Sequence, residues 1–297
     1  MLVKTLLAFS ALAVSTACAG AQEIDWKKVD EVFGRTATVN QDVHRYGFPR
    51  SDLQVSVDGV RLRPALALGG WVAFKPAHGG AMVMGDLVLL ETEINPVMSK
   101  LIENGLEITA VHNHVLRANP PTFYMHIGGH GDPVKLATAI RTALGESKTP
   151  LQPAGVSDAA PPPTIDIDTA QIEQVLGAKG QANAGVYQFN VPRRDPITEH
   201  NVQLLPPGPT GVATVINFQA TGNGKAAITG DFVLTADEVN PVIKALRSNG
   251  IEVTAIHSHM LSEQPRLIFM HFWANDDALK LARGLREALD KTASTKG

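Results

Sequence analysis

The sequence contains a single cysteine, Cys18, and no marked excess of charge of either sign. One cysteine excludes an intrachain disulfide, and a chain processed after residue 21 has no thiol nucleophile. The 26 Lys and Arg residues against 29 Asp and Glu residues leave a formal net charge of −3. No overall basic field attracts nucleic acid or an anionic membrane, so we expect no nucleic-acid partner.

Signatures of several common enzyme classes are also missing. The chain has no serine nucleophile elbow, no Walker loop and no dinucleotide-binding fingerprint. His112-Asn113-His114 spells the name of a nuclease motif, but the ββα-metal pattern and the basic character of those nucleases are absent. No apolar run is long enough to span a bilayer, so we expect no transmembrane segment.

The N-terminus has the three parts of a signal peptide. Lys4 provides the positive charge, residues 6–14 form a short apolar run, and Ala19-Gly20-Ala21 places small residues where a signal peptidase acts. We therefore expect a signal peptide at residues 1–21 and a periplasmic or secreted protein that begins at Gln22. The alternative is a lipoprotein anchored at Cys18, although the usual Leu three residues before the cysteine is missing.

The rest of the chain contains an internal repeat. From Gly85 to His126 each residue aligns without a gap with the residue 145 positions later, and 20 of these 42 positions are identical, which indicates two homologous units. Upstream, Pro49–Asp52 aligns with Pro192–Asp195 at an offset of 143. We place the first unit at residues 22–146 and the second at residues 167–297, joined by a Pro- and Ala-rich linker at residues 147–166.

Hydrophobic periodicity and turn residues predict the same elements in each unit. In the first unit we expect helices at residues 26–33 and 133–144, a helix capped by Thr92 that ends at Asn104, and strands at residues 53–57, 71–74, 81–90, 106–116 and 122–127. Asp237 is the expected N-cap of the corresponding second helix. This order predicts an α+β fold of two tandem units, each an antiparallel or split βαβ sheet with helices on one face.

Three histidines recur at equivalent positions in both units. His112 and His114 are two residues apart on a predicted strand, so their side chains leave the same face. With His126 from the next strand they would supply three imidazoles, the donor set of an open site for a divalent transition metal such as zinc. We therefore expect a metal cluster in each unit, with these ligands: His112, His114 and His126 in the first, and His257, His259 and His271 in the second.

The first cluster depends on strand register. If Arg117–Pro121 is the turn between the strands, Leu116 lies opposite Thr122 and His112 lies opposite His126. A slip of one residue would turn His126 to the other face of the sheet.

Buried histidines with a structural role are the alternative to metal ligands. Ile108 and Ala110 lie on the same predicted strand face, so the imidazoles would sit in the core and hydrogen-bond to the backbone or to Asp52. Repetition does not decide between the two explanations, because a structural network would be copied as well.

Other polar residues are repeated too. Arg50 with Asp52, and Arg193 with Asp195, would bind an anionic ligand through the arginine or form structural ion pairs. Glu93 and Glu238 follow the predicted helix caps, where an acid stabilises the helix dipole. Asp86 and Asp231 are also equivalent in the two units. Each follows a glycine, and we expect each to mark a β-bulge.

Differences between the units favour the first as the active one. His44, His78 and His130 have Tyr187, Asn223 and Asn275 as their counterparts. Residues 128–132 form a glycine-rich segment, predicted as a loop, in which His130 and the backbone N–H groups would approach a ligand.

Three blocks of the sequence are similar to a known family. The blocks "PRSD", "GDLVLLETEINPVMSKLIENGLEITAVHNH" and "YMHIGGHGDP" resemble the LppY/LpqO family of exported bacterial proteins, over nearly all of the predicted mature chain. That family is of unknown function, so the resemblance implies export and duplication and no catalytic roles.

Two classes of function fit these observations. The first is a metal-dependent hydrolase in which a histidine-bound ion activates water and a carboxylate such as Glu91 or Asp132 acts as general base. The alternative is a non-catalytic module that binds an anionic small molecule or a cell-envelope component, or a structural envelope protein. The sequence does not decide whether the protein is an enzyme.

Overall fold

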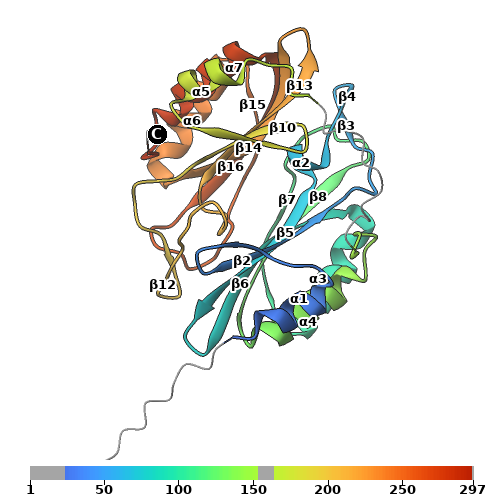
Figure 1. The fold of residues 1–297 in the computed structure, drawn as a ribbon. Coiled ribbons are helices and arrows are strands. Elements are labelled where there is room, and N and C mark those ends of the chain that lie inside the picture. Colours follow the sequence, from blue (N-terminus) through green and yellow to red (C-terminus); the bar gives the residue numbers. More distant parts are fainter. Residues whose placement is uncertain (1–23, 153–163, 296–297) are drawn as a thin grey trace, which may run out of the picture.

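The computed structural model describes residues 24–152 and 164–295, which fold into two similar halves around two antiparallel sheets (Figure 1). The predicted signal peptide, Cys18 and most of the predicted linker lie outside the described residues. Within the described residues, no helix is long and apolar enough to cross a membrane.

The first half contains a six-stranded sheet with the order β1-β2-β5-β6-β8-β7. Its strands are antiparallel neighbours throughout, and a two-stranded hairpin, β3-β4, lies outside the sheet. The elements in chain order are α1 (Trp26–Phe33), β1 (Thr38–Asn40), β2 (Val43–Pro49), β3 (Ser56–Val57), β4 (Val60–Arg61), α2 (Pro64–Ala67), β5 (Gly69–Ala77), β6 (Gly80–Leu90), α3 (Glu91–Glu103), β7 (Glu107–His112), β8 (Thr122–Gly131) and α4 (Pro133–Leu144).

The second half repeats this arrangement, with the sheet order β15-β16-β14-β13-β10-β9 and the hairpin β11-β12. Two sheets with the same connectivity show that the duplication in the sequence is a duplication of structure. The elements are α5 (Thr169–Leu176), β9 (Gly180–Asn183), β10 (Val186–Val191), β11 (Thr198–Glu199), β12 (Val202–Gln203), β13 (Thr214–Gly222), β14 (Lys225–Leu234), α6 (Ala236–Ser248), β15 (Glu252–His257), β16 (Ile268–Asp277) and α7 (Ala278–Leu289).

Successive side chains of the central strands point to opposite faces of each sheet. On β6, Leu87 and Leu89 join a core cluster with residues of α1, α3 and α4, whereas Met84 and Val88 join clusters that contain residues of the second half. This is the period-two pattern of a strand that is buried on both sides. The long helices therefore lie outside, and the other faces of the two sheets pack against each other (Figure 1). The short helix α2 contacts β13 and β14 of the other half.

The edge strands β7 and β15 close one side of the space between the sheets. The Thr109 hydroxyl donates to the His259 carbonyl, and the Thr254 hydroxyl donates to the His114 carbonyl, each at 2.6 Å. Since these are equivalent residues of the two repeats, the halves are related by a pseudo-two-fold axis that passes between the two strands. At the opposite edges, β1 and β9 do not pair with each other.

Helix α3 begins earlier than the sequence pattern predicts. Its N-cap is Leu90 rather than Thr92, because the Glu93 carboxylate accepts the Leu90 N–H at 2.9 Å and so satisfies the first turn from inside the helix. Helix α6 begins in the same way, with Thr235 rather than Asp237 as the N-cap and Glu238 as the acceptor.

Candidate metal centre

The repeated histidines stand on the inner faces of both sheets. His126 on β8 lies between Asp86 on β6 and Ala110 on β7. His271 on β16 lies in the same way between Asp231 on β14 and Ala255 on β15. Because strand partners share a face, each aspartate is carried to the same side as its histidine.

The predicted register of the first cluster is wrong by two residues. His112 lies opposite Tyr124, not His126, because β7 ends at His112 and residues 113–121 connect it to β8. The connection to β8 is therefore longer than the turn assumed from the sequence. Since the shift at the histidines is an even number of residues, His112 and His126 stay on the same face.

The six imidazoles form one cluster between the repeats instead of one cluster in each. The shortest distances between ring centroids all join one repeat to the other: His112 to His257 at 3.6 Å, His114 to His271 at 3.8 Å and His126 to His259 at 3.9 Å. The sequence could not show this, because it depends on how the inner faces of the two sheets dock.

Burial keeps five of the six rings neutral. Removal from water, with the neighbouring imidazoles, lowers the pKa of His112, and burial holds the pKa of four others well below the ordinary value: His114, His126, His259 and His271. Neutral imidazole is the form that binds metal ions.

Backbone carbonyls orient the rings of the second repeat. The Nδ1 atoms of His271, His259 and His257 lie 2.7, 3.2 and 3.2 Å from the carbonyl oxygens of Gly230, Gly211 and Ser258. A carbonyl only accepts, so each Nδ1 carries the proton. Each Nε2 therefore presents a lone pair, the arrangement found in histidine metal ligands.

Two triplets of imidazoles are close enough to hold one ion. The ligand atoms lie within 4.8 Å of one another in His112, His257 and His271, and also in His126, His257 and His259. The Nε2 atoms of His112 and His271 are 3.2 Å apart. Two nitrogens bound to one tetrahedral zinc at about 2.0–2.1 Å lie about 3.3 Å apart, so this spacing fits a shared ion.

Polar atoms without partners are concentrated in this cluster. Seven of its buried nitrogen and oxygen atoms make no hydrogen bond within the described structure: Asp86 Oδ1, His112 Nδ1, His114 Nε2, His126 Nε2, Asp231 Oδ1, His257 Nε2 and His259 Nε2. Each such group costs about 1–3 kcal/mol when it stays unsatisfied. The carboxylate oxygens and the Nε2 atoms of His257 and His259 offer lone pairs, so a cation is the partner that would satisfy them together.

One contact is repulsive unless something lies between its atoms. Asp231 Oδ2 is 2.9 Å from His259 Nε2, whose Nδ1 already carries the ring proton for the Gly211 carbonyl. Two lone pairs then face each other. A proton or a metal ion shared by both atoms removes the repulsion. His114 Nε2 and Asp86 Oδ2 are the equivalent pair, at 3.4 Å, and burial raises the pKa of Asp86.

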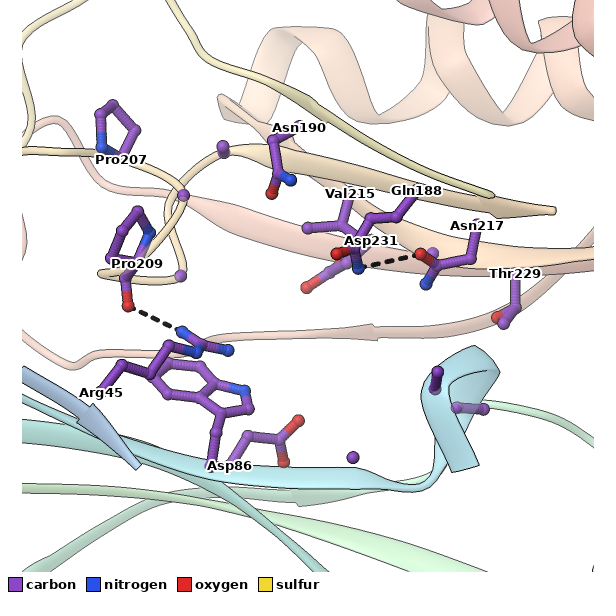
Figure 2. Close-up of a pocket in the computed structure, with 18 of the residues that line it drawn as sticks. Arg45, Asp86, Gln188, Asn190, Pro207, Pro209, Val215, Asn217, Thr229 and Asp231 are labelled. Carbon is purple, nitrogen blue, oxygen red and sulfur yellow. Dashed lines mark hydrogen bonds between the residues drawn. The ribbon is translucent and has the colours of Figure 1, made fainter. Parts of the chain in front are cut away.

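A cavity of about 690 Å³ leads to the centre. Its lining includes Asp86, His114, Asp231, His259 and His271 of the centre. Figure 2 shows Asp86 and Asp231 entering from opposite sheets, with Arg45 beside Asp86 and the amides of Gln188, Asn190 and Asn217 on the other wall. The centre is therefore within reach of a small molecule.

Comparison with known proteins identifies the family. The family described as "Domain of Unknown Function (DUF1259)" matches residues 27–146 and 170–291. The chain belongs to this family. Its two matches coincide with the two repeats.

Other comparisons with the DUF1259 chain are distant. No curated protein matches it. The trimeric bacterial microcompartment shell protein PduB is 15% identical, with 85% of this chain and 90% of that chain covered and a TM-score of 0.20. EtuB from Clostridium kluyveri is 9% identical, with 86% and 90% covered and a TM-score of 0.19. Neither likeness is close enough to bear on the centre.

The repeated arginines of the DUF1259 chain lie away from the cavity and inside the protein. The Arg50 side chain is 0% exposed, and it donates to Asp52, to the Val88 carbonyl and to Glu93. These contacts use all its N–H groups. Arg193 repeats them with Asp195, Val233 and Glu238. The structural ion pair thus accounts for Arg50, Asp52, Arg193 and Asp195, and we do not carry them into the proposed site.

The other sequence-predicted residues also stand apart from the centre. His130 is exposed and pairs with Met82, since residues 128–131 continue β8 and are not the loop expected from their glycines. Asp132 caps α4 by accepting the Lys135 N–H at 2.8 Å, and Glu91 is exposed in the first turn of α3.

Sequence reasoning missed the two aspartates of the centre. Asp86 and Asp231 do not mark bulges: the pairing of β6 with β8 and of β14 with β16 is regular through both residues. Their identity in both repeats and their place on a strand beside the histidine strand were the available signals. Arg45 was missed because its counterpart in the second repeat is a glutamine.

Proposed function

We propose that this protein binds one divalent transition-metal ion, such as zinc, between its two repeats and acts on a small molecule in the adjoining cavity. The observation that carries the proposal is the group of seven unpartnered polar atoms in one buried cluster. The residues that would hold the ion are those of the two triplets, with Asp231 or Asp86 as a carboxylate ligand.

One ion for the whole chain follows from the place of His257. Both triplets include this residue, and its Nδ1 proton is directed at the Ser258 carbonyl, so only Nε2 is available. A single nitrogen lone pair binds a single ion. The expected stoichiometry is therefore one ion per chain and not one per repeat.

Hydrolysis is the activity that best fits such a site. An ion held by imidazoles with an open position polarises an ester, amide or phosphoryl oxygen and lowers the pKa of bound water. The chain's own residues would hold and orient the reactants: His114, His259 and His271 line the cavity, and the polar side chains of its walls would bind the substrate.

Elemental analysis tests the metal site directly. The untagged protein, purified without chelator and then reconstituted with zinc and dialysed, should contain about one equivalent of a transition metal. A chain that retains no ion after reconstitution would contradict the proposal. The imidazoles would then be hydrogen-bonded to one another, and non-catalytic binding of an anionic or cell-envelope ligand would become the better explanation.

Export is a separate proposal, supported by the N-terminal sequence and by the resemblance to LppY/LpqO proteins. We place the mature protein in the periplasm with Gln22 as its first residue. Mass spectrometry of the exported protein would show this N-terminus; a lipid-modified Cys18 would contradict it.

A further inference from the structure

The two walls of the cavity come from equivalent positions of the two repeats. Thr38 pairs with Arg45 across β1 and β2, and Gln181 pairs with Gln188 across β9 and β10, so Arg45 and Gln188 correspond. On the next strands Trp71 pairs with Asp86 and Val215 pairs with Asp231, so Trp71 and Val215 correspond. At the floor of the cavity the pairs Asp86 and Asp231, and His114 and His259, are identical between the repeats, whereas the wall positions differ.

Because Arg45 corresponds to Gln188, only the wall from the first repeat carries a cationic side chain. Arg45 is the only Lys or Arg among the described residues that line the cavity, and it has no ion-pair partner among the described residues. Its guanidinium carbon lies 3.7 Å from the centre of the Trp71 ring, and Nη1 donates to the Pro209 carbonyl at 2.7 Å (Figure 2). The stacked ring and the carbonyl hold the planar group in place.

The guanidinium keeps its charge at neutral pH. Burial lowers the pKa of Arg45 to about 10, and the nearby charge of Asp86 opposes the shift. The N–H groups that Pro209 does not use are left for the cavity. A fixed, charged fork of this kind matches the oxygens of a carboxylate or a phosphate.

We propose that Arg45 binds the anionic group, a carboxylate or a phosphate, of the small molecule that reaches the metal centre. Gln188 and Asn190 on the opposite wall hydrogen-bond the rest of that molecule. This inference rests on the proposed function, because Asp86 and Asp231 on the floor repel an anion until an ion compensates their charge. The anion and the ion therefore bind cooperatively.

The inference is tested by calorimetric titration of the full mature chain with inorganic phosphate and with acetate. We expect the zinc-loaded wild type to bind at least one of the two probes, and the preferred probe identifies the anionic group. Arg45→Gln should weaken that binding at least tenfold, whereas Arg45→Lys, which keeps the charge without the fork, should weaken it less. Arg283→Gln removes the same charge from the exposed face of α7 and should change nothing.

Zinc content, measured in the same samples, separates the two proposals. Arg45→Gln should keep the wild-type zinc content, because Arg45 is not a ligand. Phosphate and acetate affinities within twofold of wild type in zinc-loaded Arg45→Gln would overturn the anion site and leave the metal centre standing, and so would the failure of both probes to bind the wild type. Binding that depends on Arg45 in a wild type that retains no zinc would support Arg45 as the anion ligand, but it would refute the metal centre and the cooperativity.

Discussion

His257 differs from the other imidazoles of the centre because it belongs to both possible triplets. Its ring lies against His112 of the other repeat. His112 and His271 complete one set of ligands, and His126 and His259 complete the other. If one triplet loses a residue, the other triplet can still bind the ion. If His257 is lost, neither triplet is complete.

The first prediction follows from this arrangement. His257→Ala should reduce the zinc content after dialysis from about one equivalent to near zero, whereas His112→Ala should retain zinc through His126, His257 and His259. His130→Ala, outside the cluster, is the matched control and should behave as wild type. Elemental analysis of the three variants measures this, and equal retention by His257→Ala and His130→Ala would refute the shared-ligand arrangement.

At the scale of elements, buried ion pairs join the starts of α3 and α6 to their sheets. Arg50 donates to Glu93 of α3, and the Lys148 N–H that follows α4 donates to the same carboxylate at 2.9 Å. Burial acts to raise the pKa of Glu93, but the hydrogen bonds from Arg50, Leu90 and Lys148 outweigh it, so the pKa lies below the ordinary value. The ionised form of Glu93 therefore stabilises the fold.

The second prediction concerns the dependence of this contribution on pH. Glu93→Gln should lower the free energy of unfolding at pH 7 by about 3 kcal/mol, because it removes one partner of a buried pair. A group with a lowered folded pKa stabilises the protein above its unfolded pKa, and this contribution is lost as the pH falls through the folded value. The difference between wild type and variant should therefore narrow below about pH 4.5.

Urea denaturation between pH 3 and pH 7 would measure the effect. Glu91→Gln removes an exposed carboxylate from the same helix turn and is the control. A Glu93→Gln deficit that stays constant across this range would show that the ionisation of Glu93 is not its source.

The third prediction also belongs to the elements, since a glycine allows β13 and β14 to approach at the centre. A Cβ at Gly230 would lie 1.9 Å from the Val215 carbonyl oxygen, and the Gly230 carbonyl accepts the His271 Nδ1 proton. Gly230→Ala should cost about 3 kcal/mol of stability or prevent folding, because backbone must move. Gly128→Ala, whose nearest new contact is a methyl group at 3.8 Å, should cost less than about 1 kcal/mol. Thermal unfolding of both variants measures the difference.

At the scale of the whole molecule, the centre is a joint between two homologous sheets. Two apolar clusters containing residues of both repeats lie beside it, one with Trp273 and Tyr124 and the other with Phe269 and Met84. Each triplet of imidazoles takes ligands from both repeats. A bound ion should therefore stabilise the joint as well as prepare a site.

The fourth prediction is a shift in stability caused by zinc. At a free zinc concentration of about 1,000 times the dissociation constant, the folded state should gain about 4 kcal/mol. The unfolding temperature should rise on addition of zinc and fall again with chelator in the wild type, and it should not change in His257→Ala. Scanning calorimetry measures both proteins, and an equal rise in the two would show that zinc acts elsewhere.

Local patterns in the sequence were enough to predict that the chain is duplicated, where most helices and strands lie, and that the histidines share one face of the sheet. Residues 26–33 and 133–144 are helices as expected, and His112 and His126 share a face although their register was wrong by two residues. These features follow from periodicity within one strand or helix, where each side chain's direction is set by its neighbours.

Only the tertiary structure decided which groups share the centre. Asp86 lies beside the histidines because β6 pairs with β8. Arg50 forms a buried ion pair with Glu93 because α3 packs beside it. His112 met His257 of the other repeat because two apolar sheet faces dock there, and no local pattern records which face a strand will meet. Side-chain direction is a property of the strand, whereas a site shared by two repeats is a property of long-range packing.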